Sequence, residues 1–211
     1  MVIGGKAEGL IRLQELGLPV PPFVPVPVGE EVDEAAVAAL GEPLAVRSSA
    51  VGEDAAERSA AGQYETVLGV TRPTLPDAIA HVRSSTERAH AYGAGGDVAV
   101  VVQRQVPATR AGVAFSSDPV SGDGAVLIEC ALGCGEAVVS GEVTPDRYRV
   151  AGERVHARAT GAARTLRDDE AREVAGLVRK AEAGFEGPVD VEFCFEGRKL
   201  WLVQCRPITT V

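Results

Sequence analysis

The chain has 211 residues, 45% of them hydrophobic and 24% charged, and a formal net charge of −9 at pH 7. This composition is typical of a soluble globular protein long enough to bury a core, and the acidic balance argues against a nucleic-acid binder, which needs a basic face to neutralise phosphates. No apolar run approaches the length of a membrane span and no leader-like segment opens the chain, so we expect no membrane role and a cytoplasmic location.

The first fifth of the chain predicts two short helices separated by an extended segment. The leucine spacing over Leu10–Leu16 predicts a helix that Gly17 ends. The prolines of Leu18–Val28 exclude a helix and favour an extended path. A second helix is expected at Asp33–Leu40, with Asp33 as its N-cap.

The next segments predict a strand, a helix and another strand. A buried strand is expected at Leu44–Arg47, followed by a polar loop over Ser48–Ala61. Thr74–Tyr92 has the periodicity of a helix. The β-branched run Val98–Gln103 predicts a central strand.

Short strands separated by Gly, Asp and Pro turns dominate the second half. One charged amphipathic helix is expected at Arg167–Ala183, and the turn Glu196–Arg198 joins the last two strands into a hairpin. We therefore predict an α+β protein of two lobes, residues 1–104 and 105–211, with a cleft between them. The strands of the second lobe are expected at Ala111–Ser116, Ala125–Ala131, Asp146–Val150, Arg154–Arg158, Val189–Phe195 and Lys199–Gln204.

Lys6 stands at the start of the first helix, directly after Gly4 and Gly5. A lysine at a helix N-terminus combines a cation with backbone N–H groups, and both favour phosphate. The segment is not a P-loop, because too few residues precede Gly4 for the strand and loop of that motif. An ordinary helix start is the alternative.

Two further segments offer phosphate ligands. Arg47 ends a strand, where open sheets place ligands, and its guanidinium suits bidentate contact with phosphate. The same Arg-Ser-Ser tripeptide at Arg83–Ser85 lies in a helical segment, where we expect a solvated face. Small residues precede Gly62–Thr66 and let backbone N–H groups approach phosphate, and Thr66 adds a hydroxyl. A tight turn into a strand at Thr66–Val70 explains this segment equally well.

The last two strands hold the most informative pattern. Asp190 and Glu192 share one face of a strand, while its valines share the other. Gln204 and Arg206 share a face of the partner strand. Gathering such groups is costly in a core but worthwhile if they hold Mg²⁺ and triphosphate; a salt-bridged sheet face is the alternative. Glu136, next to a glycine, is a further candidate carboxylate.

The histidines and cysteines give no independent site. His81, His90 and His156 are expected to be surface or internally satisfied residues rather than catalytic ones. The four cysteines contain no Cys-x-x-Cys pair, which favours reduced core or loop thiols over a disulfide or a zinc site.

The order of short sequence blocks along the chain is distinctive. The blocks are Gly4–Ala7, Leu18–Phe23, Val46–Ala50, Glu53–Asp54, Ser59–Thr66, Val101–Gln103, Gly112–Phe115, Asp118–Pro119, Gly133–Gly141, Pro145–Asp146, Asp190–Glu192 and Gln204–Thr209. In this order they resemble the nucleotide-binding domain of the phosphoenolpyruvate synthase and pyruvate phosphate dikinase family, which also includes rifampicin-phosphorylating enzymes and water dikinases. The resemblance spans essentially the whole chain.

The resemblance implies an ATP-grasp architecture of mixed or antiparallel sheets, with Mg-ATP held between the two lobes. Phosphoryl transfer depends mostly on positioning and charge neutralisation, and the implied roles fit that need. By this resemblance, Lys6 and Arg47 would hold phosphates, Gly62, Gln63 and Thr66 would cover the triphosphate, and Gln103 would lie against adenine. Glu192 and Gln204 would bind Mg²⁺, and Asp190 would support them. Arg206 would neutralise charge on the transferred group, and Glu136 is a further cleft candidate.

Three functions fit this resemblance. The first is a kinase that transfers a phosphoryl or pyrophosphoryl group from Mg-ATP to a carrier histidine on a partner protein, because no histidine here has the setting of the family's carrier histidine. The second is a stand-alone kinase that phosphorylates a small molecule directly. The third is an ATP-binding module without catalysis, against which the retained set of Lys6, Arg47, Glu192, Gln204 and Arg206 argues.

Overall fold

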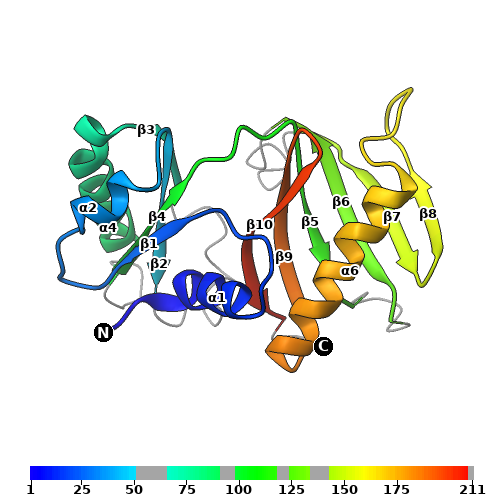
Figure 1. Cartoon of the computed structure of the whole chain (residues 1–211), viewed down its shortest axis with the longest axis horizontal. Coiled ribbons are helices and arrows are strands. Elements are labelled where there is room, and N and C mark those ends of the chain that lie inside the picture. Colours follow the sequence, from blue (N-terminus) through cyan, green and yellow to red (C-terminus); the bar gives the residue numbers. More distant parts are fainter. Residues whose placement is uncertain (51–65, 91–97, 118–123, 134–142, 209–211) are drawn as a thin grey trace. The chain divides into compact units, whose positions relative to one another are not determined.

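The computed structural model describes residues 1–50, 66–90, 98–117, 124–133 and 143–208, which belong to two compact units (Figure 1). The first unit comprises Met1–Ile11 and Pro21–Gln105, and the second comprises Arg12–Val20 and Val106–Val211. Helix α1 (Gly4–Glu15) therefore begins in the first unit and ends in the second. No helix in the described part of the chain is both long and apolar enough to cross a membrane.

The first unit is built on a four-stranded antiparallel sheet with the order β1-β4-β2-β3. Its helices are α2 (Glu34–Ala38) and α4 (Leu75–His90), and a 3-10 turn, η1 (Arg72–Thr74), precedes α4. The strands are β1 (Phe23–Val26), β2 (Leu44–Ala50), β3 (Thr66–Val70) and β4 (Val98–Arg104). The central position expected for the Val98–Gln103 strand is confirmed.

The core of this unit lies between the sheet and helices α2 and α4. Val46 and Val102 pack there with Ile79 of α4. Because side chains alternate along a strand, Arg47 and Gln103 lie on the other face of the sheet, away from α4.

Local sequence explains where these elements begin and end. The Asp33 carboxylate accepts hydrogen bonds from the N–H groups of Ala35 and Ala36, both at 3.0 Å, so the predicted N-cap of α2 is confirmed. Gly17 follows α1 with a φ of +68°, a left-handed conformation that favours glycine after a helix. Pro25 lies in β1, an edge strand, where a missing N–H is tolerated.

Strand β2 is longer than the sequence indicated. The expectation that the strand ends at Arg47 and that a polar loop begins at Ser48 is wrong, because the strand continues to Ala50. Ser48 and Ser49 both continue the pairing of β2 with β4. The hydroxyl of Ser49 accepts a hydrogen bond from the Ala7 N–H at 3.1 Å, which satisfies a buried polar group inside the fold.

The second unit contains a six-stranded antiparallel sheet with the order β10-β9-β5-β6-β7-β8. Helix α6 (Asp168–Phe185) lies along one face of this sheet, and the core is between them (Figure 1). Each strand matches a segment expected from the sequence, and the β9–β10 hairpin is confirmed. The strands are β5 (Arg110–Phe115), β6 (Val126–Leu132), β7 (Asp146–Ala151), β8 (Arg154–Arg158), β9 (Val189–Glu196) and β10 (Lys199–Pro207).

A β-bulge in β10 changes which side chains point into this core. Leu202 pairs with Phe193 and Gln204 pairs with Glu192, so Val203 is the extra residue. Leu202 and Phe193 both lie in the core, and strict alternation would direct Gln204 there as well. Because of the bulge, Gln204 lies opposite Glu192 on the face away from α6.

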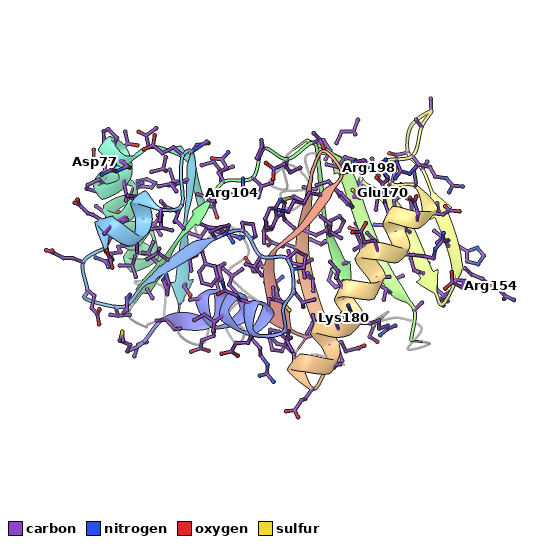
Figure 2. The ribbon with its side chains drawn as sticks, viewed as in Figure 1. Asp77, Arg104, Arg154, Glu170, Lys180 and Arg198 are labelled. Atoms are coloured by element: carbon purple, nitrogen blue, oxygen red, sulfur yellow. The ribbon has the colours of Figure 1, made fainter. Side chains whose placement is uncertain are left out.

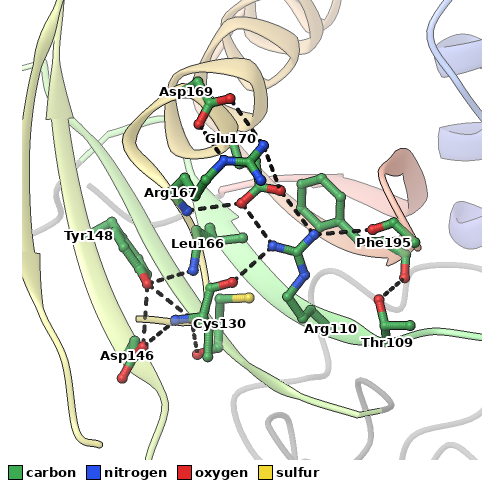
Figure 3. Close-up of polar contacts among 12 residues, drawn as sticks. Thr109, Arg110, Cys130, Asp146, Tyr148, Leu166, Arg167, Asp169, Glu170 and Phe195 are labelled. Carbon is green, nitrogen blue, oxygen red and sulfur yellow. Dashed lines mark hydrogen bonds and ion pairs between the residues drawn. The ribbon is translucent and has the colours of Figure 1, made fainter. Parts of the chain in front are cut away.

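A buried polar network fastens the segment before α6 to the sheet (Figure 3). The Asp146 carboxylate accepts hydrogen bonds from the N–H groups of Thr160 and Thr165, both at 2.7 Å, and from the Thr160 hydroxyl at 3.0 Å. Burial alone would raise the pKa of Asp146, but these hydrogen bonds outweigh it and hold the pKa below its ordinary value. The Tyr148 hydroxyl adds a bond from the Leu166 N–H at 2.8 Å.

Arg110 makes a second connection to α6 (Figure 3). Its guanidinium donates to both carboxylate oxygens of Glu170, at 2.8 and 3.1 Å, and to the carbonyl oxygens of Thr165 at 2.9 Å and Gly197 at 3.2 Å. The same group lies 4.4 Å from the ring centroid of Phe195. Burial would raise the pKa of Glu170, but the bonds from Arg110 and neighbouring groups lower it overall. Arg110 therefore joins β5, the first turn of α6 and the β9–β10 turn.

Candidate functional site

Three of the expected site residues lie on the face of the first sheet that points away from α4. Arg47 of β2 pairs directly with Thr66 of β3. Gln103 of β4 pairs with Ala45, which precedes Arg47 by two residues on β2. Directly paired residues, and residues two apart on one strand, share a sheet face. The structure thus brings Arg47, Thr66 and Gln103 onto one face.

Gln103 is buried on this face with an unsatisfied donor. The residue is 3% exposed, and among the described residues nothing accepts a hydrogen bond from its Nε2. A buried polar group without a partner costs about 1–3 kcal/mol. A ligand that presents an acceptor, such as a ring nitrogen of a nucleobase, would remove that cost.

Lys6 lies in the first turn of α1, in the same unit as this face. Gly4 has a φ of +72°, and a Cβ there would lie 2.0 Å from the carbonyl oxygen of Ser49, so only glycine lets the helix begin against β2. The Ser49 hydroxyl accepts a hydrogen bond from the N–H of Ala7. One of the N–H groups that the sequence offered to phosphate is therefore used within the fold.

Four other expected residues form an array on the face of the second sheet that points away from α6. Glu192 pairs directly with Gln204, and Asp190 pairs directly with Arg206. The Nε and one terminal nitrogen of Arg206 each lie 2.8 Å from Asp190 Oδ2. The Asp190 side chain is 10% exposed and that of Arg206 37% exposed, so the ion pair lies at the edge of solvent.

This array combines oxygen ligands with a cation. The Glu192 carboxylate and the Gln204 amide oxygen are of the type that Mg²⁺ prefers. Within the described ranges, no group of three or more His, Cys, Asp or Glu could hold a metal ion by itself. Nucleotide-bound Mg²⁺ usually takes one or two protein carboxylates together with phosphate oxygens and water. The donor set therefore fits Mg²⁺ brought by a nucleotide better than a site that binds the metal alone.

The remaining expected residues are partly outside the described chain. Gly62, Gln63 and Glu136 lie outside the described residues, so their roles stay predictions. His81 on α4 and His156 on β8 are exposed, as expected for surface histidines, and the side chain of His90 lies outside the described part of the chain.

The described cysteines are core residues. Cys130, Cys194 and Cys205 are buried thiols, and Cys134 lies outside the described residues. Burial raises the pKa of Cys130 and of Cys205 to about 12. Reactive cysteines have a lowered pKa and some exposure, so these thiols have a structural role.

Sequence reasoning missed Ser49, which fixes the start of α1, and Val203, which places Gln204. The polar residues Ser48 and Ser49 after the apolar run Leu44–Val46 favour a loop at this point when the sequence is considered alone. The signal for the bulge was present: Leu200, Leu202 and Gln204 have the same parity, and one polar member among them is inconsistent with uninterrupted alternation.

The sequence matches the family model described as pyruvate phosphate dikinase, AMP/ATP-binding domain, over residues 24–163 and 153–211. It is 37% identical to the probable phosphoenolpyruvate synthase of Archaeoglobus fulgidus, 36% identical to a rifampicin phosphotransferase of a Streptomyces species, and 32% identical to the prodigiosin synthesizing transferase PigC of Serratia marcescens. These matches cover 80%, 88% and 99% of this chain, respectively. They cover 27%, 26% and 32% of those relatives, so the chain spans about a third or less of their length.

Solved structures share the fold at low sequence identity. D-alanine–D-alanine ligase from Bacillus anthracis complexed with ATP aligns with a TM-score of 0.55 and 13% identity, over 98% of this chain and 55% of that one. N5-carboxyaminoimidazole synthetase from Staphylococcus aureus complexed with ADP aligns with a TM-score of 0.57 and 14% identity, over 98% and 45%. With its two antiparallel sheets, the chain has the ATP-grasp fold, and the α+β prediction is confirmed.

Proposed function

Because this chain belongs to the family of pyruvate phosphate dikinase AMP/ATP-binding domains, we propose that it binds Mg-ATP and transfers a phosphoryl or pyrophosphoryl group to a histidine on a partner protein. The acceptor is assigned to a partner because His81 and His90 lie on α4 and His156 lies on β8, and none of them lies on the strands that hold the proposed site. The family relatives with phosphotransferase or synthase names support the reaction type.

In the second unit, the proposed roles concern the metal and the transferred group. The side-chain oxygens of Glu192 and Gln204 hold Mg²⁺, which supplies charge neutralisation and orientation of the phosphates. Asp190 positions Arg206 through the contacts at 2.8 Å. Arg206 then stabilises the negative charge that develops on the group in transfer.

In the first unit, the proposed roles concern the phosphates and the base. Lys6 and Arg47 neutralise phosphate charge, and the Thr66 hydroxyl donates a hydrogen bond to a phosphate oxygen. Gly62 and Gln63 belong to the loop that covers the triphosphate, and Glu136 is a further candidate for contact with the nucleotide. Gln103 donates its Nε2 hydrogen to the adenine. The histidine nitrogen of the partner attacks phosphorus, and the bond between that phosphorus and the nucleotide oxygen breaks. The nucleotide leaves as ADP after phosphoryl transfer and as AMP after pyrophosphoryl transfer.

The observation that best supports this proposal is the array of Glu192, Gln204, Asp190 and Arg206. A structural ion pair would need only Asp190 and Arg206. The bulge at Val203 interrupts the β9–β10 ladder, yet it is what brings Gln204 opposite Glu192 on the face away from the core. Bulges that redirect a side chain are frequent beside active sites, which favours a ligand-binding role for this pair.

Phosphorus NMR of Mg-ATP mixed with the chain tests the proposal. The acceptor probe is the Archaeoglobus fulgidus relative from which the region matching this chain has been deleted. We expect slow hydrolysis with the chain alone, and with the probe we expect AMP or ADP together with acid-labile phosphate on a histidine of the probe. Glu192→Ala is the matched inactive variant. No nucleotide turnover above that variant, with or without the probe, would contradict the proposal.

Direct phosphorylation of a small molecule is the second candidate. The identity to a rifampicin phosphotransferase, 36%, is nearly the same as the identity to the phosphoenolpyruvate synthase, 37%, so sequence similarity does not favour one acceptor. The same NMR experiment with rifampicin as the acceptor probe distinguishes the two. Phosphorylated rifampicin formed without any phosphohistidine would support direct transfer.

A further inference from the structure

The two outermost strands of the second sheet have a strongly basic face. Val150 of β7 lies in the core, and Val155 of β8 packs against it. By alternation, the opposite face of these strands, which points away from α6, presents only basic residues and Ala151. We call the basic residues the arginine face: Arg147, Arg149, Arg154, His156 and Arg158.

The arginine face places two guanidinium groups at directly paired positions. Arg147 pairs with Arg158, and Arg149 pairs with the imidazole side chain of His156. Like charges at directly paired positions destabilise a sheet. Glu129 of β6 lies 2.9 Å from Arg147, whose side chain remains 66% exposed. In a chain with a net charge of −9, this local concentration of arginine is suited to contact an external anionic group.

Protection of a sheet edge does not explain this face. Charged side chains on an edge strand prevent pairing with another chain, and β8 is an edge strand. However, β7 is an interior strand, and it contributes Arg147 and Arg149 to the same face. Arginine differs from lysine in its planar, bidentate recognition of carboxylate and phosphate, which suits recognition better than simple repulsion.

The arginine face continues the sheet face that holds the proposed site. The paired positions run from Gln204 through Glu192, Val113 and Glu129 to Arg147 across neighbouring strands. Glu192 and Arg147 are three strand spacings apart, or about 14 Å at about 4.8 Å per spacing. A protein domain bound to the arginine face would therefore extend naturally over Glu192.

We propose that the arginine face docks an acidic surface of the protein domain that brings the phosphoryl acceptor to Glu192 and Gln204. This inference rests on the proposed function. The basic groups are distributed over two adjacent strands, so they match several carboxylates on a surface better than one small ligand. A nucleic acid is less suited, because the chain's overall negative charge repels a polyphosphate, whereas a protein can offer carboxylates locally.

Charge reversal at β8 tests this docking surface. The test variant is Arg154→Glu/Arg158→Glu, and the matched control with the same change in net charge is Lys180→Glu/Arg198→Glu, in α6 and in the β9–β10 turn (Figure 2). Glutamate still protects the edge strand, so a purely protective role predicts no effect of the reversal on binding. The probes are a fluorescein-labelled glutamate 20-mer and a labelled dT 20-mer, titrated by anisotropy without ATP at low and moderate salt.

We expect the parent to bind the glutamate peptide in a salt-sensitive manner, the β8 variant to bind at least about tenfold more weakly, and the control variant to change by less than about twofold. Equal weakening in both variants, no binding by the parent, or tighter binding of the dT 20-mer that the β8 reversal abolishes would each overturn the proposal. Mg-ATP affinity, measured separately on the same variants, should be unchanged. Failure of docking is thereby distinguished from failure of nucleotide binding.

Discussion

Replacing Gln103 with leucine should stabilise the ligand-free protein and weaken nucleotide binding at the same time. Leucine is similar in size to glutamine and has no donor to leave unsatisfied. The buried Nε2 of Gln103 has no acceptor among the described residues, so its removal should raise the free energy of unfolding by about 1–2 kcal/mol. For a chain of this length, that corresponds to a rise in melting temperature of roughly 2–8 °C.

The expected loss of nucleotide affinity follows from removal of the same Nε2 hydrogen of Gln103, which we propose donates to the adenine. One hydrogen bond to adenine contributes about 0.5–1.5 kcal/mol, so Gln103→Leu should weaken Mg-ATP binding by roughly 2–12-fold. Gln105→Leu is the matched control, because the Gln105 Oε1 accepts a hydrogen bond from the Gly69 N–H at 2.6 Å. That variant should lose stability and keep its nucleotide affinity. If Gln103→Leu also lost stability and bound Mg-ATP normally, the assignment of Gln103 to the adenine would be refuted.

Three further predictions concern the second unit. Arg110→Met leaves the Glu170 carboxylate, which is 6% exposed, without its main partner, so the free energy of unfolding measured by urea denaturation should fall by about 3 kcal/mol. A fall of less than about 1 kcal/mol would mean that the pair is not a stabilising contact. The lowered pKa of Asp146 means that its stabilising contribution is present above about pH 4 and is lost as the pH falls through its folded-state pKa, so Asp146→Asn should flatten the acid limb of a pH-stability profile; an unchanged slope would contradict the network. Because burial raises the pKa of Cys130 and Cys205 to about 12, native protein should not react with a thiol reagent at these positions until it unfolds, as mass spectrometry of the labelled peptides would report.

Much of the fold could be predicted because most helices and strands are marked by residues within or next to the element itself. The β-branched run of β4 and the alternation of β9 with Val189, Val191 and Phe193 inward match the structure. The Asp33 cap and Gly17 stop also depend only on neighbouring residues. These features need no knowledge of distant contacts.

The structure differs from the sequence-based prediction where contacts with residues distant in the sequence determine the local structure. Ser48 and Ser49 suggested a loop, but pairing with β4 and the contact of Ser49 with the Ala7 N–H keep them in a strand. Likewise the β10 bulge depends on pairing with β9, which sequence alternation alone does not specify.

The candidate site was partly predictable for a related reason. The pairing of Asp190 with Arg206 and of Glu192 with Gln204 was expected as a shared face, and the structure supplies the direct partners. The unsatisfied Nε2 of Gln103 could not be predicted, because it depends on what surrounds a buried side chain.

Isothermal titration of the chain with ATP, with and without Mg²⁺, tests the central claim most directly. Glu192→Ala serves as the comparison, because it removes the carboxylate that we propose as a Mg²⁺ ligand. This carboxylate lies on the face away from the core, so the melting temperature should be nearly unchanged. We predict saturable binding of Mg-ATP to the parent, weaker binding in EDTA, and loss of that Mg²⁺ dependence in the variant. No heat of binding at millimolar Mg-ATP, or the same Mg²⁺ dependence in both proteins, would contradict the account.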